Sequence, residues 1–224
     1  MFARFDKMSK TFTKYGKEIA IAVKSGGTDP ESNAKLRAVI ANAKSQNMPK
    51  DRIEAAIKRS AGKDTSNYEE IAYEAMCMKG VGLVIETATD NPTRTVANIR
   101  MHLNRGGGEL GKSGCLDFAF DRKSVFVIST DNINADELEL ELIDAGCDEI
   151  EVIEDKVFVY GDYTAFGTIA KALEDMNIEV QKSNLQRIPT SPIDLTEEQM
   201  NDVEKLLDKI EDDDDIQQVF TNIS

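Results

Sequence analysis

Residues 124–188 read SVFVISTDNINADELELELIDAGCDEIEVIEDKVFVYGDYTAFGTIAKALEDMNIEVQKSNLQRI, and this stretch decides the fold class of the chain. Short runs rich in Val, Ile and Phe alternate in it with longer amphipathic segments. The spacing predicts strands at 125–128, 150–153, 157–160 and 178–185, and helices at 135–145 and 163–176. The order β-α-β-β-α-β is the ferredoxin-like plan. We therefore predict an α+β domain over residues 123–189.

The sequence on either side of this stretch predicts a second α+β domain. Before it we expect strands at 68–78 and 81–89 around a Lys79-Gly80 turn, a helix at 93–104 opened by Asn91-Pro92, and a strand at 114–120. After it, the linker 189–192 precedes a helix at 196–210 and a short strand near Val219-Phe220. These last elements are expected to rejoin the strands of 68–120. The prediction is a ferredoxin-like domain of residues 65–122 plus 190–224, with 123–189 inserted in it.

Residues 1–64 predict a bundle of three helices. In the first helix, apolar side chains recur every three or four positions, at Phe5, Met8, Phe12, Tyr15, Ile19 and Val23. Gly26-Gly27 should end it, Asp29-Pro30 should cap the second helix, and Pro49 should open the third. The polar run 63–67 marks the domain boundary. The whole chain is thus expected to be a multidomain α+β protein.

The charge of the chain is divided unevenly along its length. The 224 residues carry a formal net charge of -14, which by itself argues against nucleic-acid binding. Residues 1–63, however, hold 14 Lys/Arg and 6 Asp/Glu, a net of +8, whereas the rest holds 13 and 35, a net of −22. The longest apolar run, 19–23, is far below the roughly 20 residues of a membrane span, so no membrane partner is expected.

A basic module on an acidic protein indicates a nucleic-acid partner. On the first helix, Lys7, Lys10, Lys14 and Lys17 follow one face opposite the apolar stripe. We predict that these lysines contact phosphate, together with Lys50, Arg52, Lys58 and Arg59. Charge and spacing do not distinguish DNA from RNA.

One segment matches a catalytic motif but not its context. Residues 106–113 fit G-x-x-x-x-G-K-[ST], the phosphate-binding loop of nucleotide hydrolases. That loop needs a strand before it and a helix after it, so that the helix N-terminus faces the phosphates. Here the predicted order is reversed, and we interpret the segment as a glycine-rich turn.

The remaining chemically active side chains form no catalytic pattern. His102 is the single histidine, and Cys77, Cys115 and Cys147 are widely spaced, which predicts core thiols in a reducing, cytoplasmic compartment. The acidic run 211–215 lacks the ligand spacing of a calcium loop and is expected to be a solvated loop. We predict a non-enzymatic protein with no catalytic residues, no metal site and no cofactor.

Several segments resemble the YebC/PmpR family, in order and over essentially the whole chain. They are 33–37, the specific run Asn47-Met48-Pro49-Lys50-Asp51 with its continuation to Lys58, 89–96, 120–123 and 210–212. The resemblance implies a helical bundle and two α+β domains, one inserted in the other. It also implies a cytosolic regulator of gene expression, described for bacterial members as a DNA-binding transcriptional regulator.

Two other functions stay open at this point. Related mitochondrial members are translational activators, so the resemblance also implies a translation factor bound to ribosomal RNA or tRNA. A third hypothesis is a protein-interaction module whose acidic domains bind a basic partner. Family members usually begin with a further short basic segment, whereas Met1 here falls just ahead of Lys7. A start codon assigned too late, or a true lack of that segment, would each account for the difference.

Overall fold

The computed structural model describes residues 2–62, 67–131 and 133–224, with side chains from Met8 onward. Packing divides it into two compact units. The first contains residues 1–21, 63–121 and 188–224, and the second contains residues 22–62 and 122–187. Helix α1 (Phe2–Gly26) therefore contributes residues to both units. The predicted boundary at 63–67 falls largely on residues 63–66, which lie outside the described residues.

The first unit is built on a four-stranded sheet whose strands come from both ends of the unit. Its order is β3 (Glu109–Leu110), β1 (Glu69–Met76), β2 (Gly82–Thr89) and β8 (Ile216–Thr221). Strand β2 pairs antiparallel with β1 on one side and with β8 on the other. The prediction that the C-terminal strand rejoins the strands of 68–120 is confirmed.

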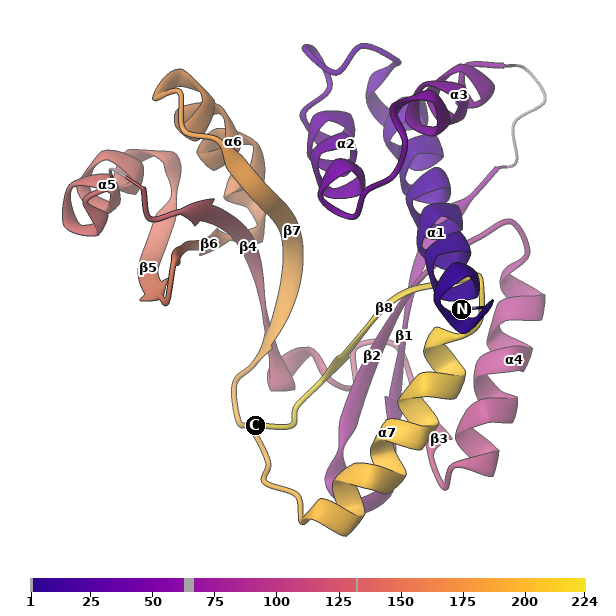
Figure 1. The fold of residues 1–224 in the computed structure, drawn as a ribbon. Helices are drawn as coiled ribbons and strands as arrows, with labels where there is room; N and C mark the ends of the chain where they lie inside the picture. Colours follow the sequence, from indigo (N-terminus) through magenta and orange to yellow (C-terminus); the bar gives the residue numbers. More distant parts are fainter. Residues whose placement is uncertain (1, 63–66, 132) are drawn as a thin grey trace. The chain divides into compact units, whose positions relative to one another are not determined.

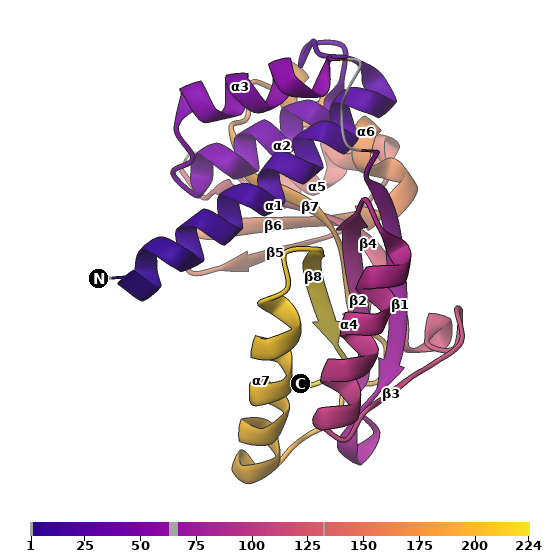
Figure 2. The ribbon, with the colours of Figure 1, turned by 90° about the vertical axis from the view of Figure 1, so that its right-hand side faces the viewer.

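Two helices cover one face of this sheet. Helices α4 (Pro92–Arg105) and α7 (Glu197–Glu211) lie side by side against it (Figures 1 and 2). Asn91 caps α4 and Thr196 caps α7, each by accepting a backbone N–H of the first turn. The shared core is formed by buried side chains such as Leu83, Ile85, Ile99, Leu103, Val203, Leu206 and Ile210. A Cβ atom at Gly106 would lie 2.6 Å from Leu206 Cδ1, so any larger residue where α4 ends beside α7 would displace the Leu206 side chain.

The element order of this unit differs from the predicted ferredoxin-like plan. The chain runs β1-β2-α4-β3 and later α7-β8, so the unit begins with two consecutive strands rather than with a β-α-β unit. The physical reason is the short connection through the 3₁₀ turn η1 (Met78–Gly80), where Lys79 and Gly80 adopt φ values of 62° and 83°. A connection this short can join only antiparallel neighbours.

The strand predicted at 114–120 is wrong. Residues Asp117–Ala119 form a 3₁₀ helix, η2, and β4 (Phe120–Ser129) begins at its end. The reason is Glu74 of β1, whose buried carboxylate accepts the N–H groups of Gly114 at 2.7 Å and Leu116 at 2.5 Å. These N–H groups are therefore not available to a strand ladder. Leu116 and Phe120 are buried, whereas Phe118 is 80% exposed.

The second unit confirms the ferredoxin-like order predicted for residues 124–188. After β4 come α5 (Ala135–Leu142) with the 3₁₀ turn η3 (Ile143–Ala145), then β5 (Cys147–Ile153) and β6 (Lys156–Asp162). The turn η4 (Tyr163–Ala165), α6 (Phe166–Asp175) and β7 (Val180–Pro189) complete it. The sheet order is β5-β6-β4-β7. One face packs on both helices through Phe126, Ile128, Leu138, Leu142, Val157, Val159, Ile169 and Leu173.

Helices α2 (Ala34–Ser45) and α3 (Lys50–Ser60) belong to the same unit. The amide of Asn42 on α2 donates to the Ser183 carbonyl at 2.6 Å and accepts the Ser183 N–H at 3.0 Å. Pro49 precedes α3 as predicted, and α1 ends at Gly26. A separate three-helix bundle, the insertion of one domain in the other and the three domain ranges remain predictions.

The cap predicted at Asp29-Pro30 is wrong, because Asn33 caps α2. The Asn33 side chain accepts the Leu36 N–H at 3.0 Å and donates to the Ala22 and Gly27 carbonyls at 2.7 and 2.9 Å. One buried amide thus satisfies the end of α1 and the start of α2, whereas Asp29 only stabilises the turn between them, accepting the Glu31 N–H at 3.1 Å. Within the described part of the chain, no helix has the length and apolarity that crossing a membrane requires.

The role of Glu74 is tested by replacing Glu74 with Ala. We expect the free energy of unfolding to fall by about 2–3 kcal/mol, because two buried N–H groups lose their acceptor. Urea denaturation measures this change. Glu69→Ala, at an exposed position of the same strand, is the control and should change stability by less than about 0.5 kcal/mol. Equal losses for the two variants would contradict the assignment.

Candidate functional site

The lysines of α1 meet the acidic run at the end of α7. Lys10 donates to the carbonyl of Asp212 at 3.2 Å and pairs with its carboxylate, and Lys14 donates to the Glu211 carbonyl at 3.1 Å. Burial lowers the pKa of Lys14, although the neighbouring acids oppose this effect. Glu211, Asp212 and Asp214 of the run 211–215 are exposed, as the sequence predicted, whereas Asp215 is buried. The run binds the helix whose lysines were expected to face a nucleic acid.

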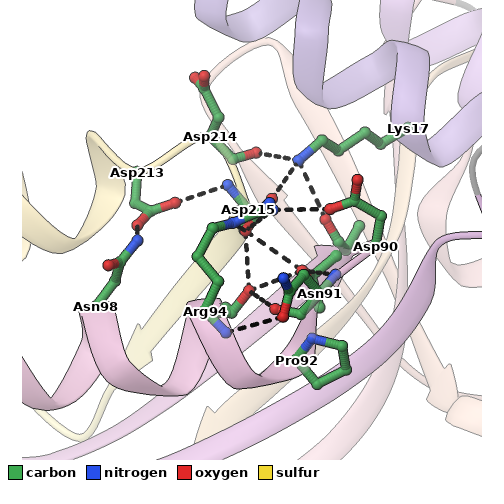
Figure 3. Close-up of polar contacts among 12 residues, drawn as sticks. Lys17, Asp90, Asn91, Pro92, Arg94, Asn98, Asp213, Asp214 and Asp215 are labelled. Atoms are coloured by element: carbon green, nitrogen blue, oxygen red, sulfur yellow. Dashed lines mark hydrogen bonds and ion pairs between the residues drawn. The ribbon is translucent and has the colours of Figure 1, made fainter.

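Lys17 is the most enclosed of these lysines and lies at the centre of the contact (Figure 3). Only 8% of the residue is exposed. Its ammonium donates to Asp215 Oδ1 and to the Asp214 carbonyl, both at 2.7 Å, and to the Ala88 carbonyl at 3.2 Å. It also lies 5.4 Å from the centre of the Tyr68 ring. All three hydrogen bonds of the ammonium are thus used within the protein.

The second oxygen of Asp215 collects donors from the start of α4. Arg94 Nη2 donates to Oδ2 at 2.7 Å and Arg94 Nε at 3.3 Å, while the hydroxyls of Thr95 and Thr89 donate at 2.8 and 3.3 Å. Arg94 also pairs with Asp90 at 2.8 Å. Asp215 therefore joins α1, the end of β2 and the first turn of α4 through one carboxylate.

Local sequence explains why these donors converge. Asn91 accepts the Arg94 N–H at 3.1 Å, and Pro92 occupies the first helical turn, so α4 begins at a fixed position. That start places Arg94 and Thr95 beside Asp215. From the other side, Asp213 accepts the Asp215 N–H at 2.9 Å and the Asn98 amide at 2.8 Å. The loop is held by its own acidic side chains (Figure 3).

The network fixes the charge state of Asp215. Burial alone would raise the pKa of this carboxyl, but hydrogen bonds from Lys17, Arg94 and Thr95 outweigh burial and lower the pKa to about 2. Asp215 is therefore ionised at neutral pH. A carboxylate buried with matched donors positions helices, and it has no proton to give in acid–base catalysis at that pH.

A polar cavity of about 410 Å³ adjoins the network. It is lined by Thr13, Lys17, Tyr68, Asp90, Arg94 and Asp213–Asp215. Four carboxylates face two cations there, so a phosphate group would be repelled. Among the described residues, no group of His, Cys, Asp and Glu is arranged to hold a metal ion. The arrangement of these side chains is that of an anchor for α1.

Four of the predicted phosphate contacts are on helix α3. Lys50, Arg52, Lys58 and Arg59 are exposed on α3, in the second unit, and Lys50 lies 3.6 Å from Glu54. Side chains before Met8 are outside the described residues, and Lys7 is among them. Lys17, predicted to contact phosphate, is buried, and its ammonium donates to Asp215.

The glycine-rich segment 106–113, the three cysteines and His102 are accounted for by their structural surroundings. The segment 106–113 follows helix α4, contains the short strand β3, and leads into turns and η2, so no helix N-terminus follows the glycines. Cys77 is buried, and Cys115 and Cys147 are partly buried, each beside an apolar core. Burial raises the pKa of all three thiols, which keeps them protonated. His102 is half-buried on α4.

Sequence reasoning missed the partnership of Arg94, Thr95 and Asp215. The chain separates Asp215 from Arg94 by 121 residues, and no local periodicity links them. The one available signal was that segments 89–96 and 210–212 both contributed to the family resemblance. The resemblance of these two segments to the family did not indicate that they lie close together in the fold.

These features define an α+β protein with two separate sheets, a basic helical N-terminus and a buried ion-pair anchor. Residues 1–63 match the family model of the TACO1/YebC protein N-terminal domain, and residues 68–223 match that of the TACO1/YebC second and third domain. The chain belongs to the TACO1/YebC family.

Relatives and one solved structure are similar over nearly the whole chain. Probable transcriptional regulatory proteins of Wolinella succinogenes and Campylobacter curvus are 56% and 54% identical, each over 99% of this chain and 94% of the relative. The crystal structure of the conserved hypothetical protein Aq1575 from Aquifex aeolicus is 33% identical with a TM-score of 0.81. That comparison covers 96% of this chain and 90% of the other.

Breaking the anchor should be costly. Asp215→Asn removes the charge that balances buried Lys17 and is expected to lower the free energy of unfolding by about 3–5 kcal/mol. Urea denaturation followed by circular dichroism measures this change. Asp214→Asn alters an exposed neighbour whose carbonyl, not its carboxylate, accepts from Lys17, and should cost less than about 0.5 kcal/mol. A small loss at Asp215 would show that the network is not an anchor.

The same carboxyl predicts a pH dependence. A folded-state pKa of about 2 lies below the unfolded value of about 3.9, so ionised Asp215 stabilises the fold above about pH 4. That contribution, about 2–3 kcal/mol, is lost as the pH falls from about 4 to about 2. The stability difference between the wild type and Asp215→Asn should therefore shrink across this window in urea titrations. A difference that is constant with pH would contradict the lowered pKa.

Proposed function

We propose that this chain is a non-enzymatic, nucleic-acid-binding regulator of gene expression that binds duplex DNA in the cytoplasm. The observation that supports this proposal best is the charge of residues 22–62. This segment holds eight Lys/Arg against four Asp/Glu. Seven of the eight are exposed: Lys24, Lys35, Lys44, Lys50, Arg52, Lys58 and Arg59. Exposed cations on helices are the usual contacts to phosphate.

The names of the relatives support regulation of transcription as the process. Each of the relatives named above is a probable transcriptional regulatory protein. A regulator of this kind needs no catalytic centre. The polar cluster around Asp215 agrees with this expectation, because it anchors a helix. The same cations could meet RNA, because phosphate contacts carry no information on the sugar or the base. A translation factor bound to ribosomal RNA is therefore the alternative that the experiment must separate.

The structure changes which residues we expect to make the contact. In this proposal the phosphates are contacted by Lys50, Arg52, Lys58 and Arg59. Two of these residues, Arg52 and Arg59, are seven positions apart and share one flank of α3. Lys17 has the role of a positioning residue, because its ammonium already has three acceptors. Lys10 and Lys14 also bind the acidic run, so their substitution would disturb α1 as well as any nucleic acid. Lys7 remains a proposed contact.

Charge reversal on α3 is the test. The variant Lys50/Arg52/Lys58/Arg59→Glu is expected to weaken binding of a labelled DNA duplex at least about tenfold in fluorescence anisotropy. Each phosphate contact adds about −0.9 to the slope of log K against log salt, so loss of four contacts should make the slope of the variant shallower by about 3 to 4. Far-ultraviolet circular dichroism checks that the variant folds.

A matched control separates local contact from total charge. The control replaces four exposed lysines outside residues 22–62 by Glu, which changes the net charge equally. They are Lys156, Lys171, Lys182 and Lys209. This control should retain most of the binding. Ribosome co-sedimentation is run in parallel. Tight ribosome association combined with salt-insensitive or absent duplex binding would overturn the DNA proposal in favour of the translation factor.

A further inference from the structure

The face of β5 and β6 that lies opposite α5 and α6 carries side chains that no part of the proposed function uses. Val157 and Val159 of β6 are buried toward α5 and α6, so the alternating residues Phe158 and Tyr160 lie on the opposite face. Their rings are nearly parallel, at an interplanar angle of 17° with centroids 6.5 Å apart, and both are half-buried.

Strand β5 places carboxylates directly beside these rings. In the register of β5 and β6, Glu149 lies opposite Tyr160 and Glu151 opposite Phe158. Both glutamates are exposed, and the Tyr160 hydroxyl donates to Glu151 at 3.2 Å. Ile153, on the same face, is 51% exposed. The result is a strip of aromatic rings, an aliphatic side chain and carboxylates that ends at Lys156, which is in register with Ile153.

The strip lies at the edge of the sheet. Strand β5 is the outermost strand in the order β5-β6-β4-β7, so one of its sides has no neighbouring strand in this sheet. An edge strand exposes N–H and C=O groups that a further extended chain can pair with. Val152, at the same end of β5, is 55% exposed and adds apolar surface there.

The acidic charge around this edge favours a partner that carries positive charge. Residues 131–155 contain eleven Asp/Glu and no Lys, Arg or His. A second copy of this chain would oppose β5 with the same acidic strand, and like charges directly opposite each other are unfavourable. Nucleic acid would be repelled for the same reason. A cationic side chain, in contrast, can stack on Phe158 or Tyr160 and pair with Glu149 or Glu151.

We propose that β5 and the face of β6 opposite α5 and α6 bind an extended, basic segment of a partner protein, in which arginine or lysine alternates with aliphatic residues. The segment adds to the edge of β5 as a further strand. Its cations lie over the aromatic rings between the glutamates, on the face that also carries Ile153, and its aliphatic side chains project to the other face, where Val152 is exposed. This site is separate from the cations proposed to bind nucleic acid, and neither proposal depends on the other.

The probe is a fluorescein-labelled peptide of sequence RVRVRVR, titrated into the full chain at physiological salt. We expect saturable binding by anisotropy. In amide NMR spectra of the labelled protein, the largest shifts should fall on residues 147–153 and 156–162. Glu149→Gln with Glu151→Gln should weaken binding at least about fivefold, because two charge pairs are lost. Phe158→Leu, which keeps an apolar side chain but removes the ring, should also weaken it.

A matched control distinguishes the site from general attraction to an acidic protein. Glu137→Gln with Glu141→Gln removes two exposed charges from α5, away from the strip, and should leave affinity within about twofold. Equal weakening by both pairs, shifts concentrated elsewhere, or no saturable binding would each overturn the proposal. Two further results would overturn it. One is that single-stranded DNA shifts the same β5 and β6 amide signals, and the other is that sedimentation shows dimers that Val152→Lys disrupts.

Discussion

Asp215 and Lys17 form an ion pair that is almost entirely removed from water, and the first unit of the protein depends on it. An isolated charge in that position would be costly, so each partner must have its hydrogen bonds filled. The Asp215 carboxylate receives donors from α1, from β2 and from α4, and the Lys17 ammonium reaches three acceptors. The N-terminal half of α1 is held to the sheet by this pairing.

The anchor also gives the acidic run 211–215 a structural meaning. Five consecutive acids would repel one another in a loop exposed to water. Here the backbone of the run accepts from Lys10, Lys14 and Lys17, while Asp213 and Asp215 satisfy N–H and amide groups within reach. The basic charge of α1 and the acidic charge of the C-terminal segment thus compensate each other inside one unit. On α2 and α3, in contrast, six Lys/Arg side chains are exposed: Lys35, Lys44, Lys50, Arg52, Lys58 and Arg59.

Local sequence predicted those elements whose signals are local. Alternating apolar residues at 125–128 and 157–160 predicted β4 and β6, and Asn91-Pro92 predicted the start of α4, because a cap acts within a few residues of itself. The strand predicted at 114–120 failed because Glu74, some 40 residues earlier, takes the N–H groups that a ladder would need. The cap at Asp29 failed because Asn33 can also bond to the end of α1.

By itself, the sequence determined the α+β class, the ferredoxin-like order of 124–188, the family, and the division of charge between a basic N-terminus and an acidic remainder. The class, the element order and the division of charge follow from periodicity and composition, which act along the chain, whereas the family follows from the resemblance of several segments to known sequences. Only the tertiary structure decided which lysines are exposed. Lys17 has the same spacing and chemistry as Lys10 and Lys14, and it differs in being buried against a carboxylate 198 residues away. Burial and ion pairing depend on distance in space, which the spacing of residues along a helix does not encode.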